Sequence, residues 1–274
     1  MAPYRWNRDR FRSAGRLIFG LQRAAQLEGS KAYSKKFMTR HGIPTARFRT
    51  VQTMEDAWRA IDEITFPAVL KADGLAAGKG VVIAEDREQA AADLPGLIGS
   101  QLVVEEFLQG REVSFIVLCD GRETVPMLPA QDHKAAFDGD TGPNTGGMGA
   151  YCDASILTIE ETQRIFSEVI QTTIEGMRAE GTPFSGFLYA GLMMTSEGPK
   201  VLEFNARLGD PETQALLHRL DSDFFTALTA GAEGNLGGTR LRWKPGASVC
   251  VVLASHGYPG ETRAGDRIEG IEQA

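Results

Sequence analysis

The chain has 274 residues, of which 42% are hydrophobic and 24% charged, an ordinary balance for a globular protein with a sizeable core. Its formal net charge of −7 argues against nucleic-acid binding, so any phosphate site must be a local basic patch. The three cysteines are far apart and lack metal-ligand spacing, and no apolar run is long enough to span a membrane. We therefore expect a cytoplasmic protein without nucleic-acid or membrane partners, and we favour a monomer.

Hydrophobic periodicity and helix caps predict strand hairpins mixed with packed helices, which indicates an α+β fold rather than a doubly wound parallel sheet. In chain order, we expect a short strand at 17–19, a helix at 31–41, a strand at 46–51, a helix at 53–64, strands at 69–72 and 81–84, and a helix at 86–97. A strand at 102–108 follows, then a hairpin of 112–119 and 123–128, a polar loop at 130–150, a helix at 159–179 and a hairpin of 186–195 and 200–204. Further along we expect helices at about 211–220 and from Asp223, a glycine-rich linker at 231–238 and a strand at 247–255. The clearest helix signals are Ser30 as an N-cap and Gly42 as a C-terminal stop.

The most informative stretch is 67–83, where an apolar run ends in Lys71 and a loop leads into a β-branched run. The loop carries three glycines and a second lysine, namely Gly74, Gly78, Lys79 and Gly80. Glycines let backbone N–H groups approach a ligand closely, and two lysines nearby suit a polyphosphate. The spacing is one residue too short for a P-loop, and a strand follows where a P-loop needs a helix. Taken alone, the stretch is better explained as a mobile hairpin turn.

Polar side chains also gather at the end of the last predicted hairpin. On a strand, Glu203 and Asn205 lie two residues apart and share a face, where a carboxylate and an amide oxygen suit Mg²⁺. A solvated sheet face explains this pair equally well. Arg207 can clamp a phosphate or a carboxylate, and Asp210 can bind an amino group. Glu212 fits either a ligand contact or a favourable charge in the first turn of a helix.

Two other stretches carry polar groups without a decisive pattern. Residues 142–149 contain four glycines and Pro143 and can present backbone donors to an anion, although a flexible crossover fits their composition better. Glu105 and Glu106 close an apolar strand, where one can accept hydrogen bonds from a ribose or an adenine amino group while the other is solvated. His133 fits an acid–base role, but a lone histidine is more often structural.

Five stretches become specific when taken together. They are 71–80 (KADGLAAGKG), 131–134 (QDHK), 140–151 (DTGPNTGGMGAY), 186–192 (GFLYAGL) and 203–214 (EFNARLGDPETQ). In this order they resemble the motifs of the phosphoribosylamine–glycine ligases (glycinamide ribonucleotide synthetases). The resemblance covers about Arg23 to Gly260. It implies an ATP-grasp fold, in which two α+β subdomains grip ATP.

The resemblance implies a role for each matching residue. It assigns nucleotide binding to Lys31, Lys71, Gly74, Gly78, Lys79, Gly80, Glu105, Glu106, Leu108 and Glu112, and metal binding to Glu203 and Asn205. It assigns substrate contacts to Lys134, Asp140, Pro143, Asn144, Thr145, Gly146, Gly147, Arg207, Asp210, Glu212 and Thr213. Catalytic roles at the transferring phosphoryl group fall to Lys71, Arg207 and Asp210.

The implied reaction joins glycine to 5-phosphoribosylamine in de novo purine (IMP) biosynthesis, with ATP and Mg²⁺ or Mn²⁺ as cofactors. The glycine carboxylate attacks the γ-phosphate of ATP, which gives glycyl phosphate and ADP. The amine then displaces phosphate to form glycinamide ribonucleotide. The Gly-rich loop would act as a lid that keeps water from the acyl phosphate.

The chain departs from the family pattern towards both ends. Residues 1–29 resemble the remnant or linker of a missing N-terminal domain. Residues 30–230 match the ATP-grasp domain, with a lid subdomain at about 45–105, and 231–274 match a linker and an incomplete C-terminal domain. Two alternatives stay open: a truncated ATP-binding fragment without full ligase activity, and an ATP-grasp ligase for another pair of amine and carboxylate.

Overall fold

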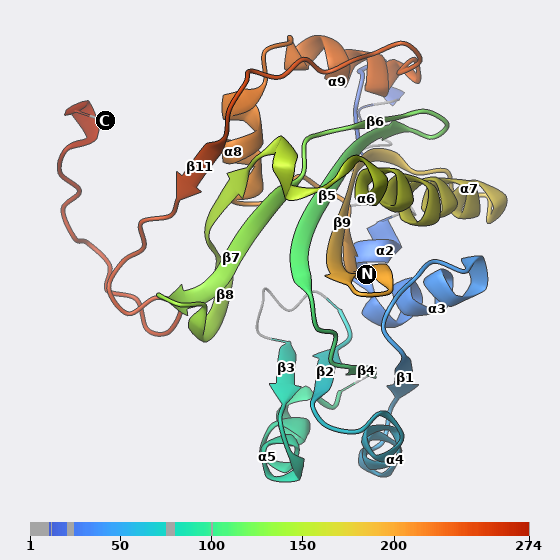
Figure 1. The fold of residues 1–274 in the computed structure, drawn as a ribbon, viewed down its shortest axis with the longest axis vertical. Coiled ribbons are helices and arrows are strands. Elements are labelled where there is room, and N and C mark those ends of the chain that lie inside the picture. The colour runs from blue at the N-terminus through green and yellow to red at the C-terminus, as the bar shows by residue number, and fades with distance from the viewer. Residues whose placement is uncertain (1–10, 12, 21–24, 75–79, 100, 274) are drawn as a thin grey trace.

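The computed structural model describes residues 11, 13–20, 25–74, 80–99 and 101–273, which form two antiparallel sheets flanked by helices (Figure 1). The small sheet contains β1 (Phe48–Val51), β2 (Ala68–Ala72), β3 (Val81–Ala84) and β4 (Leu102–Glu106). The large sheet contains β5 (Arg111–Asp120), β6 (Thr124–Pro126), β7 (Ala130–Phe137), β8 (Thr141–Cys152), β9 (Ser185–Thr195), β10 (Gly198–Asn205) and β11 (Ser248–Val251). The helices are α2 (Gln26–Gly29), α3 (Lys31–His41), α4 (Met54–Ile64), α5 (Arg87–Leu97), η2 (Ala154–Ile156), α6 (Ile159–Arg164), η3 (Ile165–Gln171), α7 (Thr172–Ala179), α8 (Glu212–Arg219), α9 (Phe224–Glu233) and η4 (Ile271–Gln273).

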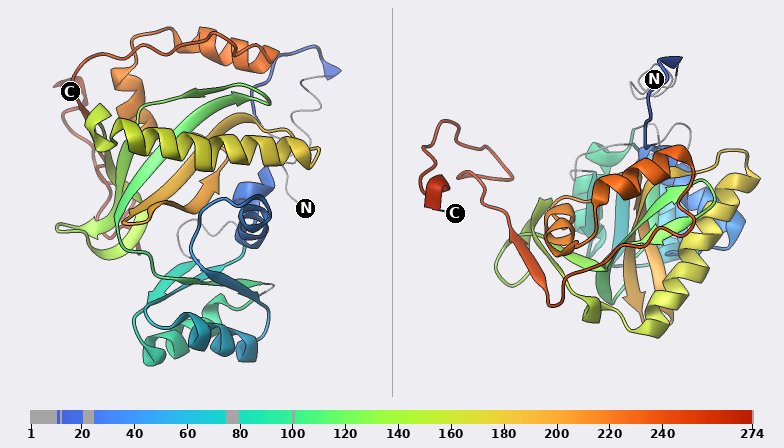
Figure 2. Two further views of the ribbon diagram at one scale, coloured as in Figure 1. Left: turned by 45° about the vertical axis from the view of Figure 1, so that its right-hand side comes forward. Right: turned by 90° about the horizontal axis from the view of Figure 1, so that it is seen from above.

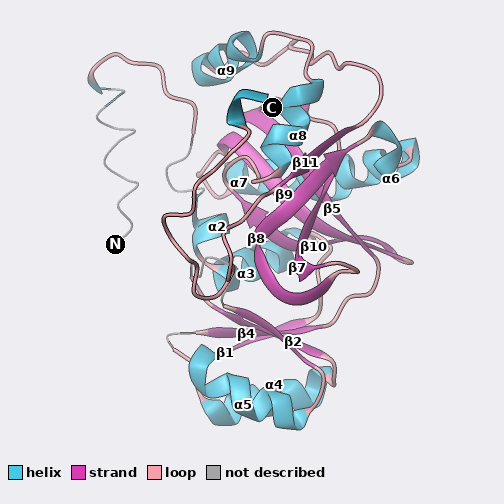
Figure 3. Cartoon of the chain, turned by 90° about the vertical axis from the view of Figure 1, so that its left-hand side faces the viewer, coloured by secondary structure: helices cyan, strands magenta, loops and turns pink. Residues whose placement is uncertain are grey.

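The small sheet has the strand order β1-β4-β2-β3, and α4 and α5 cover its face away from the large sheet (Figure 3). Both helices begin where the sequence predicts. The side chains of Thr53 and Asp86 each accept a hydrogen bond from the backbone three residues further on. Leu70 of β2 is fully buried in one cluster with Leu94 of α5, so the helices and the sheet share a single core.

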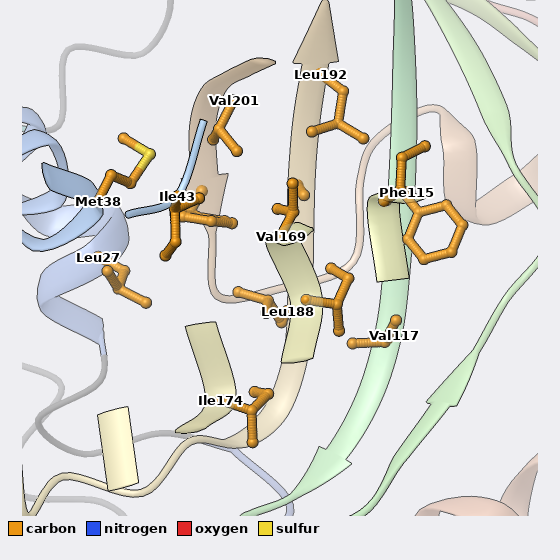
Figure 4. Packing of buried hydrophobic residues seen from close by; sticks show 14 of the residues in the cluster. Leu27, Met38, Ile43, Phe115, Val117, Val169, Ile174, Leu188, Leu192 and Val201 are labelled. Atoms are coloured by element: carbon orange, nitrogen blue, oxygen red, sulfur yellow. The ribbon is translucent and has the colours of Figure 1, made fainter. Parts of the chain in front are cut away.

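The large sheet has the order β10-β9-β5-β7-β8-β11, with β6 paired to β5, and helices cover both of its faces (Figure 2). Strand β5 shows this arrangement, because its side chains are buried on both faces of the sheet. Phe115 and Val117 lie in the core cluster that includes the long helix, whereas Ile116 and Leu118 lie in the cluster under α8 and α9. A strand buried on both faces gives a continuous apolar run, which is the pattern that predicts it. Figure 4 shows the first cluster around Val169 of the long helix.

The long helix predicted at 159–179 is present as α6, η3 and α7, and its middle segment η3 is π-helical. A side-chain hydroxyl adds a hydrogen bond to the backbone of this segment. Thr173 Oγ1 donates to the carbonyl of Val169 at 2.6 Å. Ile165 at the start of the wide segment and Ile174 in α7 are buried in the same core cluster, whereas α6 has no buried residue. The wide segment and α7 therefore present one apolar face to the sheet.

The predicted polar loop at 130–150 is wrong, because β7 and β8 form a hairpin there. Two register shifts interrupt their pairing, so the sequence does not alternate regularly. The glycines mark close packing. A Cβ at Gly147 would lie 2.5 Å from Pro211 Cδ, and one at Gly149 would lie 2.7 Å from the Cys250 carbonyl oxygen. These neighbours come from distant parts of the chain, which explains why local composition indicated a loop.

The short strand predicted at 17–19 is also wrong, since these residues have no strand partner among the described residues. Phe19 instead packs edge-on against Phe187, with 5.3 Å between ring centroids. The linker predicted at 231–238 begins later than expected, at Gly234, the left-handed residue that caps α9. The other predicted helices and strands are confirmed, with small shifts at their ends.

Candidate active site

A cavity of about 700 Å³ lies between the small and the large sheet. Its apolar lining includes Val69, Ile83, Leu108, Leu192, Met193 and Leu202. Its polar lining includes Glu28, Lys31, Lys71, Glu105, Glu112, Ser114, Asp132, Lys134, Tyr189, Glu203, Asn205 and Arg207. Apolar walls with a few convergent polar groups are typical of a small-molecule site.

A buried carboxylate organises the lysines on the small-sheet side of this cavity. Glu105 is 1% exposed, and its Oε2 lies 3.1 Å from Lys71 Nζ and 2.9 Å from Lys35 Nζ. Lys71 Nζ also donates to the carbonyl of Leu202 on the large sheet at 3.3 Å. Burial lowers the pKa of Lys35 to about 8, and the negative charge of Glu105 opposes this shift. Two lysines thus face one buried carboxylate.

Lys31 at the start of α3 faces the base of the Gly-rich loop. Its Nζ donates to the carbonyls of Ala72 at 3.0 Å and Gly74 at 2.7 Å. The N-cap residue Ser30 donates its hydroxyl to the carboxylate of Asp73, which ties the helix start to the end of β2. Burial lowers the pKa of Lys31, so losing water contacts already weakens its charged form and favours an anionic partner.

Glu203 and Asn205 share a face at the end of β10, since Asn205 Nδ2 donates to Glu203 Oε1 at 3.3 Å. A register shift between Val201 and Glu203 locally breaks the alternation of β10. Both side chains line the cavity, and they offer one carboxylate and one amide. This donor set fits a hard cation such as Mg²⁺, which commonly takes its remaining ligands from phosphate oxygens and water.

Lys134 on β7 lies among carboxylates. Its Nζ is 3.6 Å from Asp132 and 3.8 Å from Glu112. Burial lowers the pKa of Lys134, but the charges of Asp132, Glu203 and Glu112 outweigh burial, so the pKa is raised. Burial raises the pKa of Asp132, and Lys134 opposes that rise. The side chain of Lys134 is therefore a cation across the neutral pH range.

The neighbouring carboxylates Glu105 and Glu106 have different surroundings. Whereas Glu105 is buried among lysines, Glu106 Oε2 accepts a hydrogen bond from Arg47 Nε at 2.7 Å. Burial raises the pKa of Glu106, but the hydrogen bonds and the charge of Arg47 outweigh it and lower the pKa. Glu106 and Leu108 both line the cavity, so the segment after β4 forms part of its wall.

Arg207 and Asp210 follow β10, and their side chains contact different parts of the chain. Arg207 Nε lies 3.1 Å from Glu28 Oε1, and both residues line the cavity. Asp210 is exposed and accepts a hydrogen bond from Gln214 Nε2 at 2.7 Å. Arg207 therefore lines the cavity, whereas Asp210, three residues further along the chain, lies outside the lining.

Glu212 is 2% exposed and lies behind the cavity wall. Its Oε1 accepts hydrogen bonds from Ser114 Oγ and Tyr189 OH, both at 2.8 Å, and these two partners line the cavity. Burial raises the pKa of Tyr189 well above its usual range, and the charge of Glu212 adds to the rise. The tyrosine therefore remains a protonated donor to the carboxylate.

We expect Tyr189→Phe to lower the free energy of unfolding by about 1–3 kcal/mol, because it removes one donor from a buried carboxylate while keeping the ring. Urea unfolding of the purified chain measures this loss. Tyr33→Phe is the matched control, because the Tyr33 hydroxyl contacts Glu180 at 3.5 Å in an exposed setting. Equal unfolding midpoints for wild type and Tyr189→Phe would contradict the assigned network.

The structure brings most of the predicted site residues together, and it places others apart. The cavity is lined by Lys31, Lys71, Gly74, Gly80, Glu105, Glu106, Leu108, Glu112, Lys134, Asn144, Thr145, Gly146, Glu203, Asn205 and Arg207. Outside the lining lie Asp140, Pro143, Gly147, Asp210, Glu212 and Thr213. Asp140 is exposed in the β7–β8 turn. Gly78 and Lys79 lie outside the described residues.

The sequence interpretation missed several cavity residues, among them Glu28, Lys35, Ser114, Asp132 and Tyr189. Asp132 had a usable signal, because it lies two residues before Lys134 and therefore on the same face of a strand. Lys35 also had one, since it is one helical turn after Lys31. Ser114 and Tyr189 lie within long apolar strands, and nothing local separates them from core positions.

Solved structures of low sequence identity define the class of the fold. The biotin carboxylase domain of the 2-oxoglutarate carboxylase of Hydrogenobacter thermophilus, in complex with MgADP, ADP and bicarbonate, is 20% identical with a TM-score of 0.64 over 88% of this chain and 54% of that chain. The N5-carboxyaminoimidazole synthetase of Staphylococcus aureus, complexed with ADP, is 16% identical with a TM-score of 0.69 over 86% of this chain and 59% of that chain. With two sheets on either side of a polar cavity, the chain shares the fold of these two structures, and the family profile that matches the chain describes it as an ATP-grasp domain.

Closer relatives define the family. The sequence profile of the phosphoribosylglycinamide synthetase ATP-grasp (A) domain matches residues 29–213. The phosphoribosylamine–glycine ligase of Yersinia pestis is 50% identical over 97% of this chain and 64% of its own length. The structure of the Thermotoga maritima phosphoribosylamine–glycine ligase is 38% identical with a TM-score of 0.83, over 90% of this chain and 64% of that chain. The chain belongs to the phosphoribosylamine–glycine ligase family, and it spans about 64% of the length of these relatives.

The recognised resemblance and the ATP-grasp prediction are thus confirmed. Within the described residues, no helix is both long and apolar enough to cross a lipid bilayer.

Proposed function

We propose that this chain binds ATP with Mg²⁺ and carries the nucleotide site of a ligase that joins glycine to 5-phosphoribosylamine. The observation that carries the proposal is the convergence of Lys31 and Lys71 with Glu203 and Asn205 on one cavity between two sheets. Paired ammonium groups and a carboxylate–amide pair are what a magnesium–triphosphate needs. The family of the chain supplies the reaction class.

Nucleotide binding divides between the two sheets in this proposal. Lys31 and Lys71 bind the phosphates, and the segment around Glu106 and Leu108 holds adenine and ribose with help from Glu112. Gly74 and Gly80 line the cavity and would contact the phosphates, and nucleotide binding by Gly78 and Lys79, outside the described residues, stays a prediction. The contacts of Lys31 with the carbonyls at the loop base support this arrangement, because the same ammonium group would be shared by loop and phosphate.

Glu203 and Asn205 would hold the metal, which we propose to be Mg²⁺, with Mn²⁺ as a substitute. The metal supplies charge neutralisation at the phosphoryl group. Glu203 also opposes the lowering of the pKa of Lys31, so these two groups are electrostatically coupled across the cavity. The large sheet would thereby align metal and phosphate with the acceptor substrate.

The acceptor substrates would contact the large-sheet side of the cavity. Lys134 and Arg207 would bind the anionic groups of glycine and of the acyl phosphate, and the β7–β8 hairpin would present its backbone to 5-phosphoribosylamine. The residues proposed on that hairpin are Asp140, Pro143, Asn144, Thr145, Gly146 and Gly147. Asp210, Glu212 and Thr213 would complete the site, with Glu212 acting through Ser114 and Tyr189.

The proposed reaction has two balanced steps. A glycine carboxylate oxygen attacks the γ-phosphorus of ATP, and the bond to the bridging oxygen breaks to release ADP. The amine nitrogen of 5-phosphoribosylamine then attacks the carbonyl carbon of glycyl phosphate, the C–O bond to phosphate breaks, and the nitrogen releases a proton to the departing phosphate or to water, which yields glycinamide ribonucleotide. Lys71 and Arg207 would stabilise the negative charge that develops on the transferring group.

We also propose the domain organisation that the sequence indicates. The nucleotide unit comprises 30–230, with 45–105 as the lid subdomain, and the segments 1–29 and 231–274 belong to flanking regions. The protein would act as a cytoplasmic monomer. A second candidate function is ATP binding without ligation, which the cavity supports because Lys31, Lys71, Glu203 and Asn205 all line it.

Glycine-dependent ADP formation tests the ligase proposal. Purified chain is supplied with ATP, Mg²⁺, glycine and freshly made 5-phosphoribosylamine, and glycinamide ribonucleotide is detected by mass spectrometry. ADP and product in equal amounts support ligation. ATP binding by calorimetry without turnover would support the second candidate, and turnover only with another amine or carboxylate would reassign the substrates.

A further inference from the structure

Lys35 is a buried cation that the proposed chemistry does not use. It lies one turn after Lys31 on α3, and only 2% of its side chain is exposed. Its Nζ lies 2.9 Å from Glu105 Oε2 and donates to Thr45 Oγ1 at 2.6 Å. A charge held this deeply is stabilised only by its partners, which indicates that the arrangement of the partners matters.

The carboxylate of Glu105 is shared between two lysines. Its Oε2 lies 2.9 Å from Lys35 Nζ and 3.1 Å from Lys71 Nζ. Its buried Oε1 has no hydrogen-bond partner among the described residues. Lys71 is the more accessible of the two, with 11% of its side chain exposed. If Lys71 turned its N–H donors to a phosphate, Lys35 would be the cation left to compensate Glu105.

The same network joins the two sheets. Thr45 Oγ1 accepts the hydrogen bond from Lys35 Nζ and donates one to the carbonyl of Val201 on β10 at 2.6 Å. Lys71 donates to the carbonyl of the next residue, Leu202. Both lysines are therefore linked to the strand that carries Glu203.

We propose that Lys35 is a positioning residue that holds Glu105 and so frees Lys71 to bind the nucleotide phosphates. This inference rests on the proposed binding of ATP in the cavity. Without Lys35, the buried carboxylate retains Lys71 as its one ion-pair partner among the residues that the structure describes. Part of the attraction between Lys71 and phosphate is then lost to the competing ion pair. Lys35 itself stays buried and acts only through Glu105.

Calorimetric titration with MgATP and with adenosine tests this role, because only ATP has phosphates for Lys71. We expect Lys35→Met to weaken ATP binding about tenfold while leaving adenosine binding within about twofold of wild type, as fits the loss of one charge-assisted contact. Lys35→Arg should restore most of the ATP affinity. Lys36→Met, which removes the next and exposed lysine of α3, is the matched control and should bind both ligands like wild type.

A second arm tests whether the effect passes through the carboxylate. In the Lys35→Met background, Glu105→Gln removes the charge that competes for Lys71, so ATP affinity should recover to within about threefold of the wild-type value. A merely structural role predicts no recovery and an equal loss for ATP and adenosine. Either of those results would overturn the inference.

Thr45→Val provides a test that does not depend on burying a new side chain in place of Lys35. It removes the hydroxyl that orients Lys35, so the ratio of ATP to adenosine affinity should fall in the same direction, by about threefold. An unchanged ratio in Thr45→Val overturns the inference even if Lys35→Met does not fold. If the wild-type chain binds no ATP, the proposed function and this inference are both overturned. If the wild type binds ATP and every variant keeps the wild-type ratio of ATP to adenosine affinity, only this inference is overturned.

Discussion

Replacing Glu203 with alanine is expected to lower magnesium-dependent ATP turnover by about 10²–10³-fold, because it removes the only carboxylate of the proposed metal pair. Glu203 is exposed to the cavity and packs into no core cluster, so the fold should persist. Release of ADP, measured across a range of Mg²⁺ concentrations, reports the effect. Where turnover is too slow to measure, the magnesium dependence of ATP binding gives the same information.

Glu197→Ala is the control for this substitution. Glu197 lies in the same β9–β10 hairpin, and its side chain is 73% exposed and pairs with Lys200 at 2.8 Å. We expect it to leave turnover unchanged. Wild-type turnover in Glu203→Ala at every Mg²⁺ concentration would remove the metal assignment.

Leu188→Ala should reduce the free energy of unfolding by about 3–5 kcal/mol, because it opens a cavity in the main core. Leu188 on β9 is fully buried in the cluster with Val117 and Val169, and Figure 4 shows it within that cluster. Guanidinium unfolding followed by circular dichroism measures the loss.

Leu217→Ala is the matched control, since Leu217 on α8 is 39% exposed. It should cost less than about 1 kcal/mol, because a half-exposed side chain leaves no enclosed void. Similar losses for the two variants would mean that the large sheet lacks the tightly packed core described above.

Local signals predicted the helices well. Ser30 and Gly42 marked the ends of α3, and Thr53 and Asp86 marked the starts of α4 and α5, because a cap depends on neighbouring residues only. The β5 strand was predictable for a related reason, since burial on both faces makes its sequence continuously apolar.

Long-range contacts limited the prediction of the rest. The glycines of β8 indicated a loop, yet Gly147 and Gly149 are needed where Pro211 and Cys250 approach from distant segments. The sequence also left open which residue of the pair Glu105 and Glu106 is buried. That choice depends on the lysines of α3 and β2, which strand pairing and helix packing bring together.

The sequence predicted the cavity residues that lie in recognisable motifs. It did not predict the cavity residues that lie in the middle of strands. Lys71, Glu203 and Asn205 stood out because a charged or amide group ends an apolar run. Ser114 and Tyr189 did not, since polar groups that point from the middle of a strand into a cavity resemble buried core positions in the sequence. Only the hydrogen bonds to Glu212 reveal their place.

Because η3 is π-helical, the long helix should tolerate a one-residue deletion better in η3 than in α7. A wide turn holds roughly one residue more than an α-helical turn, so deleting one residue inside Ile165–Gln171 can convert it to α-helix while both flanks keep their rotation. The same deletion inside Thr172–Ala179 would rotate Met177 by about 100° away from the sheet. Natural insertions and deletions in this helix should therefore cluster in η3.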